Sequence, residues 1–321
     1  MLKFVVTGGA GFIGSTLVRS LLDQGNARVE VIDNLLTGHE ENLSEVGGRV
    51  MLYKADIRDA NALGAILGGA DTVFHLAAIP SVPRSIHEPQ LSHEVNADGT
   101  FNVLRAAAEA RVRRFVYAAS SSAYGDSETL PKVETMLPRP KSPYAVQKLL
   151  GEHYASVFYS CFGLETVSLR FFNVYGPRQD PGSPYSGVLS IFMKHLLART
   201  SPTIFGDGEQ SRDFTYVEDV AELCVKAAHA PSTVAGKMFN AGNGGRYTLN
   251  QIWSLLQQIE GVQIAPKFGP PREGDVRHSM ADTSAAVAGL GHAPRFTIEE
   301  GLKKTLEWYR TAAIRTTQEV A

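Results

Sequence analysis

Short apolar runs alternate with segments of helical periodicity along the first half of the chain. Runs rich in β-branched and aromatic residues predict buried strands, whereas apolar residues three and four positions apart predict helices. Alternation of this kind is typical of an α/β fold with a doubly wound parallel sheet and helices on both faces. We expect strands at 2–6, 28–32, 50–55, 72–78, 114–119 and 164–170, and helices from Phe12, over 94–110 and over 144–162.

A glycine-rich turn with the sequence TGGAGFIG separates the first strand from the first helix. Glycine permits the tight turn, lets the backbone approach a pyrophosphate and allows close helix–strand packing. The helix N-terminus then offers free N–H groups and a partial positive charge to phosphates. In this strand–turn–helix context the motif predicts a Rossmann-like dinucleotide site formed by Gly8, Gly11, Phe12, Ile13 and Gly14.

The second predicted strand ends at Asp33, nineteen residues beyond Gly14 (33 − 14). A carboxylate there accepts a hydrogen bond from the ribose 2′-OH and repels a 2′-phosphate. No arginine directly follows Asp33, so NAD is favoured over NADP as the cofactor. Ligands of such sheets bind at the carboxyl ends of the strands, where Asp56, Ala77, Ala78 and Ser120 also lie.

Proline and glycine residues interrupt the regular pattern after Asn173. There we expect a smaller, discontinuous C-terminal domain that binds the substrate. The segments 214–217 and 218–230 resemble a strand and a helix that return to the main sheet. The predicted division is residues 1–173 plus about 214–240 for NAD binding, and about 174–213 plus 241–321 for substrate binding.

Composition narrows the kind of partner. A net charge of −2 gives no basic field for nucleic acid and no polybasic membrane anchor. The two cysteines, Cys161 and Cys224, form no disulfide framework or clustered metal site, and we expect both to be buried apolar residues. The N-terminus lacks the pattern of a signal peptide, and no apolar run reaches membrane-spanning length. We therefore expect a cytoplasmic protein with a small-molecule substrate and no metal.

Tyr144 and Lys148 stand four residues apart on a predicted helix, so their side chains share one face. A free tyrosine titrates near pH ~10, and lowering its pKa by about 3 units needs roughly 4 kcal/mol, which an ammonium and a nicotinamide cation could supply. A serine at the end of the strand before them could hold a substrate oxygen and share its proton. Ser120 is preferred because it stands four residues before Tyr124, Ser121 is the alternative, and Ser122 is expected to face the substrate.

Over almost its whole length the chain resembles the extended short-chain dehydrogenase/reductase superfamily, and within it the NAD-dependent nucleotide-sugar 4-epimerases. Segments 80–85 and 178–181 look like those of bacterial UDP-N-acetylglucosamine 4-epimerases, which are related to UDP-glucose 4-epimerases. The other matching segments are 7–14, 33–35, 75–78, 120–122, 170–176, 211–214 and 272–277, together with Tyr144 and Lys148.

The resemblance implies C4 epimerisation of a UDP-hexose through a 4-keto intermediate. Tyr144 takes the proton of the sugar 4-hydroxyl, Lys148 lowers the pKa of Tyr144 and Ser120 holds the 4-oxygen, while the C4 hydride passes to NAD⁺. The flat ketose then turns over and receives the hydride on its other face. Net redox is zero, so NAD is expected to stay bound through turnover.

The resemblance also assigns the contacts of each ligand. Arg212 and Arg272 would grip the diphosphate, for which bidentate guanidinium contacts are suited. Further NAD contacts are Asn34, Asp56, Ile57, Leu76, Ala77, Ala78 and Asn96. The substrate contacts are Ser81, Ser121, Ser122, Asn173, Gln179, Gly187, Val188, Arg212, Arg272, Asp275 and Ser279.

Pocket size favours an N-acetylated sugar. In the family that the chain resembles, a bulky residue at the position of Ser279 narrows the space beside the 2-substituent of the sugar. Ser279 is small, and Gly187 and Ser122 also leave room. UDP-N-acetylglucosamine and UDP-N-acetylgalactosamine are therefore the expected pair, and UDP-glucose and UDP-galactose are further candidates. The resemblance also implies a homodimer in which helices 94–110 and 144–162 pair with their copies in a four-helix contact.

Related enzymes that catalyse other reactions carry different residues at the corresponding positions. Related dehydratases carry an Asp-Glu pair where this chain has Ser121 and Ser122, so dehydration is disfavoured. A UDP-glucuronate 4-epimerase or decarboxylase stays open, although decarboxylating relatives keep a glutamate at the position of Ser122. Asp33 disfavours an NADPH-dependent 4-ketoreductase. An inactive NAD-binding sensor is the non-enzymatic alternative, and it would be expected to lose the Tyr144/Lys148 pair.

Overall fold

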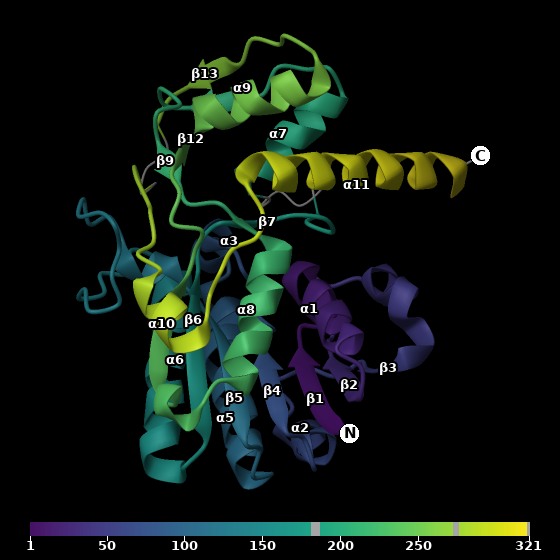
Figure 1. The fold of residues 1–321 in the computed structure, drawn as a ribbon, viewed down its shortest axis with the longest axis vertical. Helices are drawn as coiled ribbons and strands as arrows, with labels where there is room; N and C mark the ends of the chain where they lie inside the picture. Colours follow the sequence, from purple (N-terminus) through teal and green to yellow (C-terminus); the bar gives the residue numbers. More distant parts are fainter. Residues whose placement is uncertain (181–186, 272–275, 320–321) are drawn as a thin grey trace.

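The computed structural model describes residues 1–180, 187–271 and 276–319 of the chain. Within these residues, seven parallel strands form one sheet in the order β11-β6-β5-β4-β1-β2-β3, which confirms the predicted α/β fold (Figure 1). The strands are β1 (Leu2–Thr7), β2 (Ala27–Ile32), β3 (Val50–Tyr53), β4 (Thr72–His75), β5 (Arg114–Ser120), β6 (Glu165–Phe171) and β11 (Lys237–Ala241).

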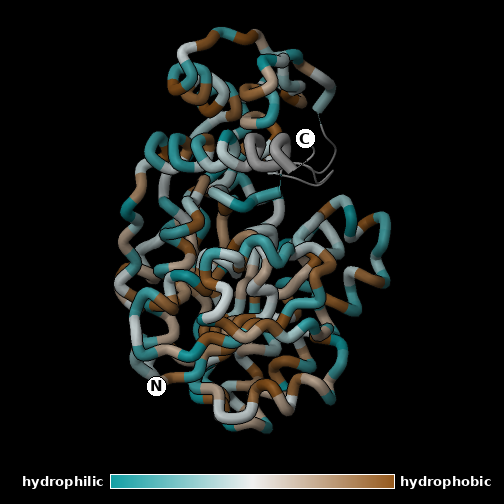
Figure 2. Tube along the Cα trace, turned by 90° about the vertical axis from the view of Figure 1, so that its right-hand side faces the viewer, coloured by the Kyte–Doolittle hydropathy of each residue, from teal (hydrophilic) through white to brown (hydrophobic). Residues whose placement is uncertain are grey.

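Each face of the sheet has its own hydrophobic core. Side chains alternate between the faces of a strand, so Phe4 and Val6 of β1 join one core and Val5 joins the other. Figure 2 shows hydrophobic stretches, in brown, running through the interior of the lower part of the molecule. The first core is covered by α1 (Phe12–Asp23), α8 (Val217–His229) and α10 (Ser284–Leu290), and the second by α2 (Ala60–Leu67), α5 (Thr100–Glu109) and α6 (Pro143–Phe162).

The predicted helix over 94–110 begins with a π-helical turn. This turn, η2 (Glu94–Gly99), leads into α5, and α4 (Pro89–His93) directly precedes it. The turn places the buried Asn96 amide against Ile79, whose N–H donates to Oδ1 at 2.8 Å and whose carbonyl accepts from Nδ2 at 3.2 Å. Such π-turns are rare and cluster at functional sites, and this one anchors the loop that follows β4.

Short helical segments lie in the connections between the strands. The 3₁₀ segment η1 packs against α1, and α3 packs against α6. These connections are η1 (Glu40–Arg49), α3 (Val82–His87), η3 (Ser121–Tyr124) and η4 (Ser232–Val234).

A third hydrophobic core lies in the C-terminal part of the chain, above the sheet in Figure 1. Phe192, Trp253 and Leu302 belong to it and come from three helices, α7 (Val188–Leu197), α9 (Leu249–Glu260) and α11 (Ile298–Glu319). Three two-stranded pairs complete this part: β7 (Val174–Tyr175) with β10 (Thr215–Tyr216), β9 (Ser211–Arg212) with β12 (Tyr247–Thr248), and β8 (Thr203–Phe205) with β13 (Lys267–Gly269).

Two predictions about single segments were wrong. The strand predicted over 214–217 does not enter the main sheet, because β10 pairs with β7, whereas α8 does lie on the sheet. Cys161 is exposed rather than buried, since it lies near the solvated end of α6. Cys224 is buried in the first core as predicted, and burial raises the pKa of its thiol to about 12.

The division into two domains stays a prediction. Residues up to 171 and β11 build the sheet, but α10, far along the chain, packs back against β11 and α8. Among the described residues, no helix is long and apolar enough to cross a membrane, and no group of histidine, cysteine and acidic side chains is arranged to hold a metal ion.

Candidate active site

A cavity of about 1050 Å³ opens where the central strands end. Residues that follow β1, β2, β4, β5 and β6 line it, and so do residues of the C-terminal part. The sheet order brings β1 beside β4, and the helices that follow these two strands cover opposite faces. Open α/β sheets bind ligands at such a switch point.

Most of the predicted site residues meet in this cavity. It brings together the glycine turn, the serine triplet, the Tyr144/Lys148 pair and residues of the C-terminal part. The predicted residues that line it are Gly8, Gly11, Phe12, Ile13, Gly14, Asp33, Asn34, Ile57, Leu76, Ala77, Ala78, Ser81, Ser120, Ser121, Ser122, Tyr144, Lys148, Asn173, Gln179, Gly187, Arg212 and Ser279.

Three predicted residues do not line the cavity. The Asn96 amide is used by Ile79 and by Ser92 and Gln147, so it holds the fold together instead. Asp56 accepts hydrogen bonds from Arg58 and Asn34, which hold its pKa at about 2. Val188 begins α7 next to the cavity-lining Gly187. Arg272 and Asp275 lie outside the described residues.

The glycine turn is shaped for a phosphate-bearing ligand. Gly8 has φ +72°, and a Cβ on it would lie 2.7 Å from the Ala77 nitrogen; a Cβ on Gly14 would lie 2.0 Å from the Gly8 carbonyl oxygen. Among the described residues, no side chain caps the first turn of α1. Its N–H groups therefore remain for the pyrophosphate of a dinucleotide. The close backbone contacts at the glycines and the uncapped N-terminus of α1 therefore both fit NAD.

Asp33 is fixed at the end of β2 by the backbone around it. Its Oδ2 accepts the Ala10 N–H at 3.0 Å and its Oδ1 accepts the Leu35 N–H at 2.9 Å. Burial raises the pKa of the carboxyl, and the two N–H groups act in the opposite direction. The side chain is thus held in one orientation on the cavity wall, as a ribose contact requires.

Tyr144 lies in the first turn of α6, where Ser85 Oγ accepts its backbone N–H at 3.1 Å. Lys148 follows one turn later; its Nζ donates to the Ala118 carbonyl at 2.9 Å and lies 5.1 Å from the centre of the Tyr117 ring. Burial lowers the pKa of Lys148 to about 8 and raises the pKa of Tyr144, while a hydrogen bond with Ser120 lowers the latter. With only these groups around it, Tyr144 is protonated near neutral pH.

The serine triplet is ordered by its own hydrogen bonds. Ser120 caps η3 by accepting the Ser122 N–H at 3.2 Å, and the Ser122 hydroxyl donates to the same Ser120 Oγ at 2.9 Å. Ser120 also lowers the pKa of Tyr144, which lines the same cavity. This interaction favours Ser120 over Ser121 as the partner of Tyr144.

A buried histidine network ties the glycine turn to the π-turn. His75 Nδ1 lies 2.7 Å from Thr7 Oγ1 and Nε2 lies 2.9 Å from Thr100 Oγ1. The Thr100 hydroxyl donates to the Asn96 carbonyl, so it accepts from Nε2–H, and Thr7 donates to Nδ1. Burial lowers the pKa of His75 to about 3, so the ring is neutral and structural.

The far end of the cavity is lined by polar residues of the C-terminal part. Asn173, with φ +25°, donates from Nδ2 to the Asp213 carbonyl at 3.1 Å and to Ser279 Oγ at 3.4 Å. Arg212 Nη1 donates to the carbonyls of Ser211 and Arg277. These bonds orient the three predicted substrate residues Asn173, Arg212 and Ser279 toward one region.

The residues of the cavity wall that sequence reasoning missed include Tyr124 and Lys132. The Tyr124 hydroxyl donates to Asn240 Oδ1 at 2.6 Å, and the Arg170 guanidinium lies 4.5 Å from its ring centre. Lys132 is buried, donates from Nζ to the Ser127 carbonyl, and burial lowers its pKa. Lys132 follows a polar loop and carries no motif, so nothing in the sequence distinguishes it from an exposed lysine.

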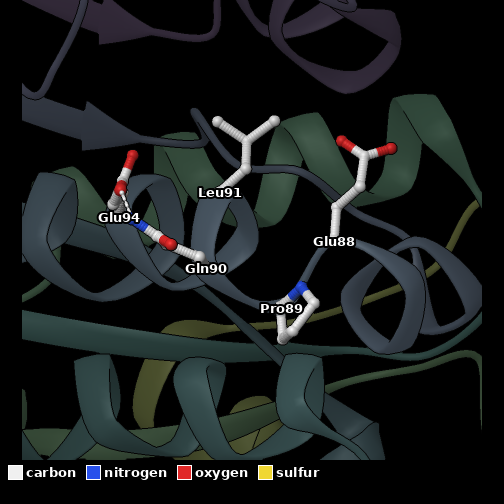
Figure 3. A pocket seen from close by; sticks show the side chains of 5 residues that line it. All are labelled: Glu88, Pro89, Gln90, Leu91 and Glu94. Carbon is white, nitrogen blue, oxygen red and sulfur yellow. Dashed lines mark hydrogen bonds between the residues drawn. The ribbon is translucent and has the colours of Figure 1, made fainter.

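A second hollow of about 360 Å³ lies at α4, and Figure 3 shows its wall. Gln90 Nε2 donates to Glu94 Oε1 at 3.0 Å, the dashed line of Figure 3. Glu94 also pairs with Arg58, and Glu88 pairs with Arg84. The charged side chains that line this hollow form ion pairs with neighbouring residues. None of the predicted catalytic residues lines it.

Comparison with known proteins places this site in a family. Residues 4–242 match the model of the NAD dependent epimerase/dehydratase family. A UDP-glucose 4-epimerase of Mycolicibacterium smegmatis is 39% identical over 313 residues, which cover 96% of this chain and 99% of the relative.

Solved structures agree with this placement. The UDP-N-acetylglucosamine 4-epimerase of Methanobrevibacter ruminantium, in complex with UDP-N-acetylmuramic acid, is 37% identical with a TM-score of 0.93, covering 97% of this chain and 99% of that one. A UDP-glucuronic acid 4-epimerase of Bacillus cereus, in complex with UDP-glucuronic acid and NAD, is 33% identical with a TM-score of 0.90, covering 97% and 100%. The chain therefore belongs to the family of NAD-dependent epimerases and dehydratases, and it is an NAD-dependent epimerase.

Proposed function

We propose that the protein inverts C4 of a UDP-hexose through a 4-keto sugar, with UDP-N-acetylglucosamine and UDP-N-acetylgalactosamine as its preferred pair. The observation that carries the proposal is one cavity that holds Tyr144, Lys148 and Ser120 together with the glycine turn and Arg212. The similar proteins described above are 4-epimerases of UDP-sugars, which supports this substrate class.

Each catalytic residue has a role that follows from its surroundings. Bound NAD supplies the acceptor and donor of the C4 hydride. Tyr144 accepts the proton of the sugar 4-hydroxyl and later returns it, and Ser120 donates a hydrogen bond to the 4-oxygen. Because burial raises the pKa of Tyr144, the Lys148 ammonium and a second positive charge in the cavity are both needed to stabilise the phenolate.

The cofactor cradle supports the proposal that NAD stays bound through turnover. The uncapped N-terminus of α1 and the close contacts at Gly8 and Gly14 fit the pyrophosphate, and Asp33 is fixed for a ribose hydroxyl. Since epimerisation has no net redox change, the protein has no need to exchange the cofactor between turnovers. We expect purified protein to work without added NAD.

Residue size at the far end of the cavity favours an N-acetylated sugar. Ser279 is small and accepts a hydrogen bond from Asn173, and Gly187 adds no side chain to the same wall. An acetamido group at C2 therefore has space there. UDP-glucose and UDP-galactose lack this group and are expected to turn over more slowly.

A UDP-uronate 4-epimerase is the second candidate. The observation that favours it is Lys132, a buried lysine on the cavity wall, with Arg84 also lining the cavity. A cation near the sugar would attract a C5 carboxylate. The structural similarity to the Bacillus cereus UDP-glucuronic acid 4-epimerase is in line with this reading.

We further propose a homodimer through α5 and α6. The aromatic rings of Phe101, Tyr154, Phe158 and Phe162 contact one another along these helices, and Phe162 is 64% exposed. Phe101 is also exposed, whereas Phe158 is buried beneath these rings. Exposed apolar side chains that gather on one face mark interaction surfaces. A Phe162→Glu variant is expected to shift the mass measured by light scattering from dimer toward monomer.

The substrate is tested by proton NMR of the purified protein with UDP-N-acetylglucosamine, UDP-glucose and UDP-glucuronate in parallel. The galacto anomeric signal should appear fastest with the N-acetylated sugar. Fastest conversion of the uronate would replace the proposed substrate by the second candidate. Conversion of none of the three, with NAD supplied, would remove the 4-epimerase proposal.

A further inference from the structure

Both hydrogen-bond donors of Ser122 point to one oxygen. Its backbone N–H lies 3.2 Å and its hydroxyl 2.9 Å from Ser120 Oγ, and both donate to it. A serine hydroxyl has one proton to donate and two lone pairs that accept. Both lone pairs of Ser120 are therefore filled, and its remaining capacity is to donate its own proton.

We propose that Ser122 is a positioning residue that makes Ser120 a donor only, directed at Tyr144 and, in the complex, at the sugar 4-oxygen. The proposal rests on the proposed function. It gives Ser122 a part in catalysis through Ser120, beyond lining the sugar site. Ser120 and Tyr144 line the same cavity, and an interaction with Ser120 lowers the pKa of Tyr144.

A donor-only serine fixes the route of the substrate proton. Ser120 has no free lone pair to accept the proton of the sugar 4-hydroxyl, so it cannot relay that proton to Tyr144. The O–H bond at O4 breaks as the phenol O–H bond of Tyr144 forms. The electron pair left on O4 forms the carbonyl bond while the hydride leaves C4 for the NAD cofactor, and the return step reverses each transfer.

Cooperativity strengthens the same contact. A hydroxyl that accepts two hydrogen bonds becomes a better donor, and a better donor stabilises the phenolate more than the phenol. Ser122 therefore lowers the pKa of Tyr144 through Ser120. The titratable and charged groups around Tyr144 and the triplet are Lys148 of α6, Tyr117 of β5, His75 of β4, Arg84 of α3, Tyr124 of η3 and Lys132.

These neighbouring groups do not obscure the effect. His75 is neutral because burial lowers its pKa to about 3, and burial raises the pKa of Tyr117 and of Tyr124. The serine substitutions leave the hydrogen-bond acceptors of Lys148 and Lys132, the carbonyls of Ala118 and Ser127, in place. Differences between variants therefore report the serine contacts.

The experiment is a pH titration of the Tyr144 ring by carbon NMR, with ¹³Cζ-tyrosine and NAD-saturated protein free of sugar. Loss of one resonance in Tyr144→Phe assigns the signal. Ser122→Ala is expected to raise the pKa of Tyr144 by about half a unit to one unit. Ser122→Thr keeps the hydroxyl and is expected to restore a titration close to that of the wild type.

A double variant separates action through Ser120 from an independent effect. Ser120→Ala alone and Ser120→Ala/Ser122→Ala are expected to titrate alike, because Ser122 has nothing left to act through. Additive shifts in the double variant, or an unchanged pKa in Ser122→Ala, would overturn the proposal. A rise in KM for the sugar without a shift in the titration likewise marks Ser122 as a sugar contact only.

The titration needs no substrate, so its outcome is independent of the proposed function. Expected shifts in a protein that converts no UDP-sugar would support the role of Ser122 and remove the epimerase proposal. Absent shifts in an active epimerase would remove the role of Ser122 alone. Kinetics then add that Ser122→Ala should lower kcat with little change in KM.

Discussion

Replacing Lys148 by methionine should stabilise the cofactor-free protein and strongly lower the activity of the NAD-bound enzyme. Lys148 is 5% exposed, and its ammonium donates to the Ala118 carbonyl. Among the described residues, no carboxylate pairs with it within ion-pair distance. Burial lowers its pKa from 10.5 to about 8. The folded protein therefore stabilises the charged form of Lys148 less well than water does.

The size of the effect follows from that shift. A shift of about 2.5 units corresponds to roughly 3 kcal/mol of cost to folding when lysine is charged. Methionine removes the charge and keeps most of the volume, but it leaves the Ala118 carbonyl without its donor, which costs about 1–2 kcal/mol. The expected net gain is about 1–2 kcal/mol in the free energy of unfolding at pH 7.

The pH dependence has a definite sign. Between pH 8 and pH 10.5 the unfolded chain binds the Lys148 proton more tightly than the folded chain. The cost is therefore complete below pH 8 and fades as the pH rises toward 10.5. The advantage of Lys148→Met should be largest at pH 7 and should shrink at pH 10.

Urea unfolding of both proteins without cofactor, at pH 7 and pH 10, measures these differences. Activity with UDP-sugar should fall by about 10²–10⁴-fold in the same variant, the range for loss of support to a general base. A variant less stable than the wild type at pH 7, or a stability difference that does not change with pH, would refute the reasoning.

Three further predictions concern other residues. Asp33→Ala should weaken NAD binding about tenfold through loss of a hydrogen bond to the ribose, measured as NAD retained after gel filtration, and an unchanged NAD content would argue against the ribose contact. Glu152→Gln should lower the free energy of unfolding by about 3–5 kcal/mol. The Glu152 carboxylate binds the Arg170 guanidinium at 2.6 and 2.8 Å, and its loss leaves that charge uncompensated in the core. Urea unfolding measures the difference, and a loss below about 1 kcal/mol would contradict this prediction. Ser279→Tyr should reduce kcat/KM for UDP-N-acetylglucosamine far more than for UDP-glucose, as NMR rates would show; equal losses would place the acetamido group elsewhere.

The strands and long helices were predictable because periodicity and the glycine turn act locally. β1, β2, β5, β6 and α6 begin and end within two residues of their predicted bounds. Gly8 and Asp33 lie on the cavity as the strand–turn–helix context indicated. Parallel sheets bring their strand ends together, so sequence order alone located most of the site.

The rest depends on contacts between distant segments. The π-turn at Asn96 exists because its amide bonds Ile79, seventeen residues away. β10 pairs with β7 through residues forty-one positions apart (215 − 174), which no local pattern reveals. Lys132 is buried because the segment around Met280 packs on its backbone. Tertiary pairing of this kind leaves no periodic signal in the chain.

Deuterium at C4 of the UDP-sugar tests the central claim most directly. Purified protein without added NAD should convert C4-deuterated UDP-N-acetylglucosamine into the galacto sugar with the deuterium retained at C4, and Tyr144→Phe should not convert it. Retention shows that the hydride leaves and returns within one active site. Conversion with loss of deuterium to solvent, or full activity in Tyr144→Phe, would contradict the account.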